Sequence, residues 1–130
     1  MGILDKLLIS GSVALAGTGI TKIVKSVREE SRRRNTPPEF DERLTQSEFL
    51  GLVEHLARTT PRVLGATVDG QIVKIHVRSN SGLTTWSAEL DFNDYGHLTG
   101  TYWIRTENDQ SPIPEFFASA LRDQIQQRIT

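Results

Sequence analysis

The side chains best suited to binding or catalysis fall at alternate positions in three expected strands between residues 72 and 105. Side chains two apart on a strand point to the same face, so these residues should share one surface of a sheet. A histidine and a glutamate on adjacent strands could act as an acid–base pair, but a flat sheet face has no water-excluding pocket. That surface carries Lys74, His76, Arg78, Glu89, Asp91, Trp103 and Arg105.

We therefore expect this surface to bind a protein partner. The predicted partner-binding residues are Lys74, His76, Glu89, Trp103 and Arg105. The alternative is a small-ligand-binding or enzymatic domain that uses the same surface. Trp103 is its unusual member, because a large aromatic ring on a polar face needs cover. It could anchor a partner, contact a second copy of the chain, or lie under the N-terminal helix.

Motifs of the common catalytic and metal sites are missing from the chain. The absence of cysteine excludes disulfides, zinc ribbons and thiol nucleophiles. The nucleophile elbow, the phosphate loop and the H-E-x-x-H zinc motif are also absent. Asp91, Asn93, Asp94 and His97 are close in sequence but do not have the EF-hand spacing, and such residues are ordinary in turns. The sequence therefore predicts a non-enzymatic protein with no cofactor and no bound metal.

The elements that position these residues are those of an α+β domain over residues 44–130. Thr45 to Glu48 matches a capping box, and the apolar stripe that follows predicts a helix ending by Thr60. The period then changes to two, and four strands joined by tight turns predict an antiparallel meander. A C-terminal helix should open at Ser111 and bury Phe117, with Leu121 and Ile125 on the same face.

A long N-terminal helix is expected to precede this domain, as an arm over residues 1–34. The arm should end at a stiff linker over residues 35–43, which holds two prolines. Its apolar residues recur every three or four positions, as in helices that lie along one another, and a neighbouring row is made of small residues. The predicted helix-interface residues are Ile9, Val13, Ala14, Ala16, Gly17, Ile20, Ile23 and Val27.

The charge is divided between the two parts. Residues 1–34 carry seven basic and three acidic side chains, whereas residues 35–130 carry eight basic and 13 acidic ones. An acidic domain argues against nucleic acid as a partner. A basic, apolar arm is typical of segments that bind a membrane surface, although its charge-free run over residues 7–21 is shorter than the roughly 20 residues of a spanning helix. The predicted membrane-surface residues are Lys22, Lys25, Arg28, Arg32, Arg33 and Arg34.

These observations predict an interaction protein that is attached to a membrane, or assembled with copies of itself, through its arm. The fifteen-residue length of the charge-free run favours self-association, whereas the row of small residues favours close helix pairing in a membrane. The basic residues that follow the run would keep the domain on the cytoplasmic side of a membrane. We therefore expect a cytoplasmic protein, or one at the cytoplasmic face of a membrane.

Overall fold

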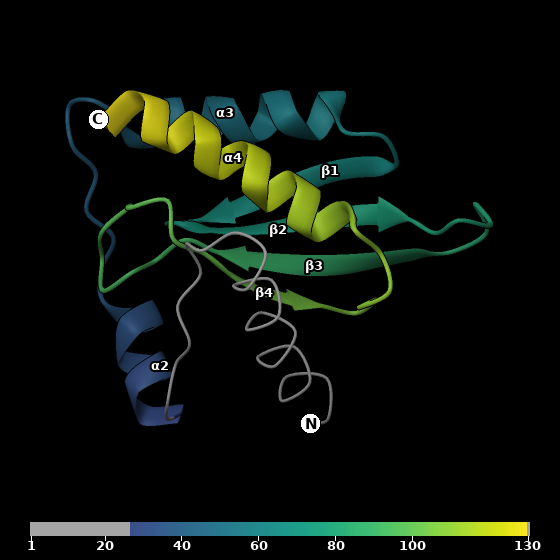
Figure 1. The fold of residues 1–130 in the computed structure, drawn as a ribbon, viewed down its shortest axis with the longest axis horizontal. Coiled ribbons are helices and arrows are strands. Elements are labelled where there is room, and N and C mark those ends of the chain that lie inside the picture. Colours follow the sequence, from purple (N-terminus) through teal and green to yellow (C-terminus); the bar gives the residue numbers. More distant parts are fainter. Residues whose placement is uncertain (1–26, 130) are drawn as a thin grey trace.

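The computed structural model describes residues 27–129. These residues form three helices and a four-stranded antiparallel sheet, which confirms the predicted α+β class (Figure 1). The elements are α2 (Val27–Asn35), α3 (Gln46–Thr59), β1 (Val63–Asp69), β2 (Ile72–Arg78), β3 (Thr85–Asp91), β4 (Trp103–Thr106) and α4 (Ile113–Ile129). Of the predicted N-terminal helix only α2 is described, and the predicted helix-interface residues from Ile9 to Ile23 lie outside the described residues.

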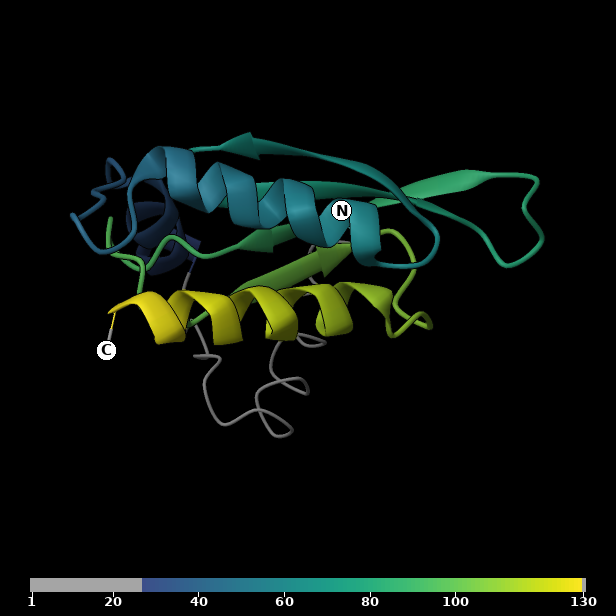
Figure 2. The same cartoon turned by 90° about the horizontal axis from the view of Figure 1, so that it is seen from above.

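Helices α3 and α4 lie side by side on one face of the sheet and run in opposite directions (Figures 1 and 2). The core between these layers takes apolar side chains from both helices and from alternate positions of the strands. Strand β2 shows the alternation most clearly, because every second residue from Val73 to Val77 is fully buried. The sheet therefore has one face under α3 and α4, and a second face, here called the polar face.

Local signals decide where α3 begins and ends. The hydroxyl of Thr45 accepts a hydrogen bond from the Glu48 amide, and the Glu48 carboxylate accepts one from the Thr45 amide. This capping box satisfies two amides that the helix itself leaves free. Bonding to the Thr45 amide holds the pKa of Glu48 below its usual range. The helix ends at Thr59, and its C-cap Thr60 stands directly before Pro61, in agreement with a predicted end by Thr60.

Strand β1 departs from the expected alternation at its start. A β-bulge between Val63 and Gly65 places two residues of β1 opposite one residue of β2. Leu64 is consequently 52% exposed, although simple alternation would put it on the same face as Ala66 and Val68. Downstream of the bulge Ala66 and Val68 pack against the core as expected.

Strand β4 is short, although the alternation of residues 98–105 predicts a longer strand there. It spans only Trp103–Thr106, and the chain between β3 and β4 forms a long loop. Within that loop Asp94 and His97 exchange backbone hydrogen bonds around a tight turn. Both central residues, Tyr95 and Gly96, have positive φ, as type I′ turns require. This loop carries Asn93 and Gly96, which bind the end of α2 and the segment that follows it.

Candidate functional site

Helix α2 covers part of the polar face. Figures 1 and 2 show it on the opposite side of the sheet from α3 and α4, with its first residues pointing away from both. The strand register explains which residues it can reach, because Ile72, Asp91 and Trp103 form one cross-strand row and Lys74, Glu89 and Arg105 form the next. The β3 and β4 members of both rows contact α2.

Arg33 is the central contact between α2 and the sheet. Its Nη2 lies 3.0 Å from Oδ2 of Asp91, its Nη1 donates to the carbonyl of Asn93, and its Cζ lies 3.5 Å from the centre of the Trp103 ring. Arg33 is 2% exposed, Asp91 is 2% exposed and Trp103 is 5% exposed. A charge so deeply buried is tolerated because an opposite charge and an aromatic face compensate for lost water.

A second group of ion pairs lies beside this contact. Arg34 donates to Glu89 over 2.8 Å, and its Nε lies 3.5 Å from Asp91. Arg105 on β4 donates a hydrogen bond to the carboxylate of Glu30 on α2, and its Nη1 lies 3.7 Å from Oε1 of Glu89. Three arginines and three carboxylates therefore neutralise one another across the junction between α2 and the sheet.

Asn93 ties the end of α2 to the β3–β4 loop. Its Nδ2 donates to the carbonyl of Arg34 at 3.0 Å, which is one of the carbonyls that the end of α2 leaves without a partner. It also donates to the carbonyl of Thr36, directly after the helix, at 2.9 Å. Its Oδ1 accepts from the Gly96 amide at 2.6 Å, so the same side chain also closes its own turn. From the sequence alone, Asn93 is expected only to form a turn. Asn93 stands two residues after Asp91, a residue of the polar face, and this spacing was the signal that could have assigned it to the site.

The segment after α2, predicted as a linker, packs on two of the tight turns. The Glu39 amide donates to the Gly96 carbonyl at 2.8 Å, and Nε2 of Gln71 donates to the Glu39 carbonyl at 3.0 Å. A Cβ at Gly96 would lie 2.7 Å from the carbonyl oxygen of Pro37, so only glycine allows this approach. A Cβ at Gly70 would lie 3.0 Å from Pro38. The prolines therefore fix the course of the chain from α2 to α3.

The predicted partner-binding residues divide into two groups in the structure. Glu89, Trp103 and Arg105 contact α2 and are partly or fully buried, whereas Lys74 and His76 on β2 are exposed. His76 lies opposite Ser87 in the strand register. Glu89 lies diagonally from His76, and its carboxylate accepts a hydrogen bond from Arg34. The acid–base pair considered from the sequence is therefore not formed by these two residues.

The predicted membrane-surface residues divide in the same way. Arg28 and Arg32 are exposed on α2, whereas Arg33 and Arg34 point into the junction with the sheet. Arg33 in particular is not part of a solvated helix end. The reason is the spacing of residues on a helix, because neighbours along the chain lie about 100° apart and only part of the arginine run can face the sheet. Lys22 and Lys25 lie outside the described residues.

Two buried donors at the junction have no hydrogen-bond acceptor among the residues that the structure describes. They are Nε of Arg33 and Nε1 of Trp103. Leaving a buried donor without a partner costs about 1–3 kcal/mol, which offsets part of the attraction between the buried charges. The docking of α2 is therefore less stable than its ion pairs alone suggest.

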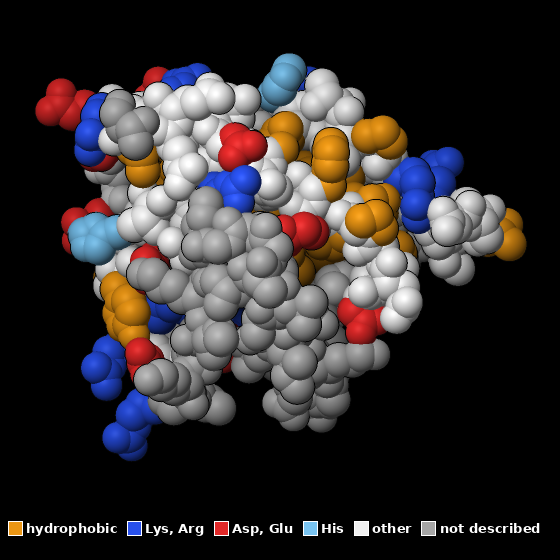
Figure 3. All heavy atoms as spheres, viewed as in Figure 1, with side chains coloured by type: hydrophobic (Ala, Val, Ile, Leu, Met, Phe, Trp, Pro, Cys, Tyr) orange, Lys and Arg blue, Asp and Glu red, His pale blue; other side chains and the backbone are white. Residues whose placement is uncertain are grey.

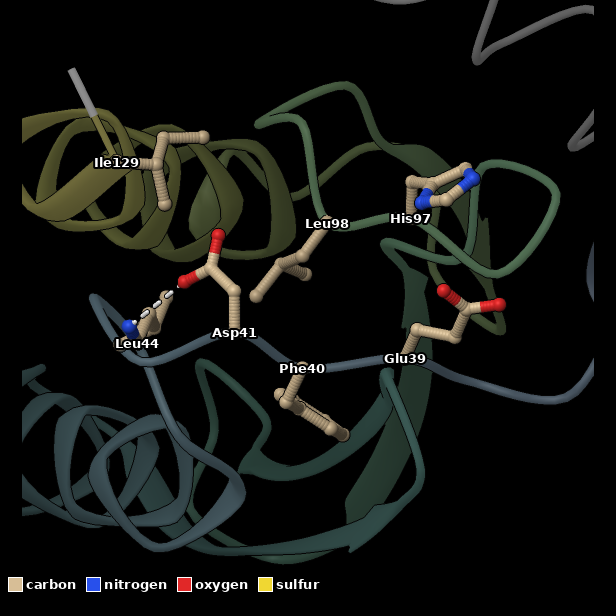
Figure 4. Close-up of a pocket in the computed structure, with 7 residues that line it drawn as sticks. All are labelled: Glu39, Phe40, Asp41, Leu44, His97, Leu98 and Ile129. Atoms are coloured by element: carbon tan, nitrogen blue, oxygen red, sulfur yellow. Dashed lines mark hydrogen bonds between the residues drawn. The ribbon is translucent and has the colours of Figure 1, made fainter.

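Two hollows lie away from this junction. The first, of about 140 Å³, is lined by Glu39, Phe40, Asp41, Leu44, His97, Leu98 and Ile129. Figure 4 shows Glu39 and His97 at one end of it and Ile129 at the other, with Asp41 bonded to the Leu44 amide at its rim. A hydrogen bond from Arg43 holds the pKa of Asp41 below its usual range. This hollow is smaller than the roughly 300–1,000 Å³ of typical small-molecule sites.

The second hollow, of about 610 Å³, is an open groove on α4. Phe116 in this groove is 61% exposed, and Figure 3 shows hydrophobic side chains gathered near the start of α4. Glu115 accepts a hydrogen bond from the Tyr102 hydroxyl at 2.7 Å, while its other oxygen is buried with no partner among the described residues. Burial raises the pKa of Glu115 above its usual range, against the lowering effect of that bond.

Comparison of the chain with protein-family models, curated proteins and solved structures finds no match. Across residues 27–129 no group of three or more histidine and carboxylate side chains could hold a metal ion. Among the helices of that same region, none has the length and apolar content needed to cross a membrane. The charge-free run over residues 7–21 lies outside the described residues.

Proposed function

We propose that the protein is a non-enzymatic attachment protein, whose N-terminal arm binds a membrane surface and whose α+β domain is presented from it to a protein partner. The observation that carries this proposal is the clamp between Arg33 on α2 and Asp91 and Trp103 on the sheet. A domain on a flexible tether needs no such contact. A buried ion pair at the end of an arm instead holds the domain in one orientation relative to whatever the arm binds.

The arm has the composition that surface attachment requires. Residues 7–21 carry no charge, and Lys22, Lys25, Arg28 and Arg32 follow on its C-terminal side. Apolar side chains inserted beside basic ones combine hydrophobic burial with attraction to anionic lipid. Arg28 and Arg32 are exposed on α2, and α2 points away from α3 and α4, which supports attachment on that side of the domain.

The experiment is vesicle flotation of the full-length protein at low and high salt. The test variant carries Val13→Asp and Ile20→Asp, which place two charges in the apolar run. The matched control carries Leu83→Asp and Phe116→Asp, which replace two apolar residues that are 86% and 61% exposed on the domain. Attachment through the arm predicts that the wild type and the control float and that the test variant does not. Equal flotation of all three proteins, or of none, would refute the proposal.

Self-association is the second candidate, and the row of small residues in the arm favours it. Replacing Ala14 and Gly17 by leucine would separate two closely packed helices. If the arms pair, this variant should have a lower mass in solution than the wild type. An unchanged mass would count against pairing through that row.

A further inference from the structure

The exposed charges on the side of the polar face are distributed unevenly. Lys74 and Arg78 lie on β2, an interior strand of the sheet, and both are exposed. Arg28 and Arg32 are exposed on α2, which lies on the same side. Three acids of this face bind arginines: Asp91 binds Arg33, Glu89 binds Arg34, and Glu30 binds Arg105. Glu30 and Asp91 are buried, whereas Glu89, which lies opposite Lys74, is half-buried.

Exposed acids also lie on this side. Asp69 is the last residue of β1, beside the turn into β2. Glu107 follows β4, and its carboxylate accepts hydrogen bonds from the amide and the hydroxyl of Ser87, the residue opposite His76. Glu29 on α2 accepts from the Tyr95 hydroxyl at 3.3 Å. The four exposed cations Lys74, Arg78, Arg28 and Arg32 therefore outnumber the exposed acids Asp69, Glu107 and Glu29 on this side, although residues 35–130 as a whole have five more acids than bases.

We infer that this surface, made of Lys74, His76 and Arg78 on β2 with Arg28 and Arg32 on α2, docks on an anionic lipid surface. The inference rests on the proposed function, since the arm supplies the primary attachment. Two observations favour lipid as the occupant. The surface is complementary in charge to anionic headgroups, and α2 leaves the domain on this same side, so an arm bound to a membrane brings this face toward it. Helices α3 and α4, with the groove on α4, then face away from the membrane.

The test compares binding of full-length proteins to phosphatidylcholine vesicles with and without phosphatidylserine. The surface variant carries Lys74→Gln and Arg78→Gln. The control carries Arg58→Gln and Arg128→Gln on α3 and α4, which removes the same charge from the other side of the molecule. Each cation near an anionic surface contributes about fivefold to binding, so the surface variant should bind phosphatidylserine vesicles roughly 20- to 30-fold more weakly. The control should bind within about twofold of the wild type, apart from weak long-range effects that salt screens.

The outcomes separate this inference from the proposed function. If the surface variant and the wild type bind phosphatidylserine vesicles equally while the arm variant fails to float, the arm is the attachment and the docking surface is refuted. If the wild type binds neither kind of vesicle, the docking surface and the proposed attachment through the arm are both refuted. A wild type that binds duplex DNA in a salt-dependent manner, and loses that binding in the surface variant without binding vesicles, would assign the surface to nucleic acid and overturn the lipid proposal.

Discussion

The guanidinium of Arg33 lies over the indole ring of Trp103, with its Cζ 3.5 Å from the ring centre, and joins the end of α2 to the short strand β4. The same guanidinium forms an ion pair with Asp91 at 3.0 Å. One side chain thus covers the aromatic ring and neutralises the carboxylate beside it. Trp103 therefore has within its own chain the cover that a large aromatic ring on a polar face requires.

Replacing Arg33 by alanine should destabilise the domain far more than the same change at Arg32. Removing one partner of a buried ion pair costs about 3–5 kcal/mol, because the other charge stays buried alone. The measured loss has an upper limit, since α2 can undock and let water reach Asp91. Arg32 is exposed, and its side chain should contribute less than about 0.5 kcal/mol. Urea unfolding of both variants tests this prediction, and equal losses would contradict it.

A double-mutant cycle should show that Arg33 and Trp103 are energetically coupled. The single changes are Arg33→Met and Trp103→Leu, which keep apolar bulk at both positions. A cation over a desolvated indole is stabilising by about 1–2 kcal/mol, and the cycle should return a coupling of that size. The measurement is the free energy of unfolding of the four proteins. Additivity within about 0.5 kcal/mol would mean that the stacked geometry contributes nothing beyond packing.

Gly96→Ala should destabilise the protein more than Gly82→Ala. Both glycines have positive φ, of 86° and 75°, so alanine brings a similar backbone cost of about 1–2 kcal/mol at each. Only at Gly96 would the new Cβ meet a backbone atom, the Pro37 oxygen at 2.7 Å, whereas at Gly82 the nearest atom is a side-chain carbon at 4.0 Å. The clash should add about 1–3 kcal/mol. Thermal unfolding measures the difference, and equal midpoints would show that the segment around Pro37 shifts without cost.

Glu115 should make the protein less stable as the pH rises through the mildly acidic range. Burial raises the pKa of this carboxyl in the folded state, so the folded protein binds its proton more tightly than the unfolded chain does. Stability from this residue is therefore greatest below the ordinary glutamate pKa of about 4.3 and falls until the raised pKa is passed. Glu115→Gln removes this slope and keeps an oxygen for the Tyr102 hydroxyl.

The measurement is urea unfolding of the wild type, Glu115→Gln and Glu54→Gln across that pH range. Glu54 is exposed on α3, so its replacement should leave the pH dependence unchanged. The stability difference between wild type and Glu115→Gln should move in favour of the variant as the pH rises. A difference that stays constant with pH would show that Glu115 ionises as readily in the folded protein as in the unfolded chain.

Elements whose causes are local could be predicted from the sequence. The capping box of Thr45 and Glu48 needs only residues three apart, and it begins α3 where the sequence predicted. The alternation of Val73, Ile75 and Val77 with polar residues depends only on the two-residue repeat of a strand. The antiparallel pairing of β1 with β2 follows from the tight turn at Asp69 and Gly70, so it too could be predicted, whereas β4 follows a long loop that the sequence did not predict.

Tertiary contacts decided the features that distinguish the candidate site. The bulge that exposes Leu64 depends on how β1 pairs with β2, and no local pattern records it. The sequence showed that Trp103 needed a cover and named the N-terminal helix as one candidate, but it could not select Arg33 from three consecutive arginines. That selection depends on the rotation of α2 about its axis, which Asn93 fixes through the Arg34 and Thr36 carbonyls. Long-range hydrogen bonds of this kind exist only once the chain has folded.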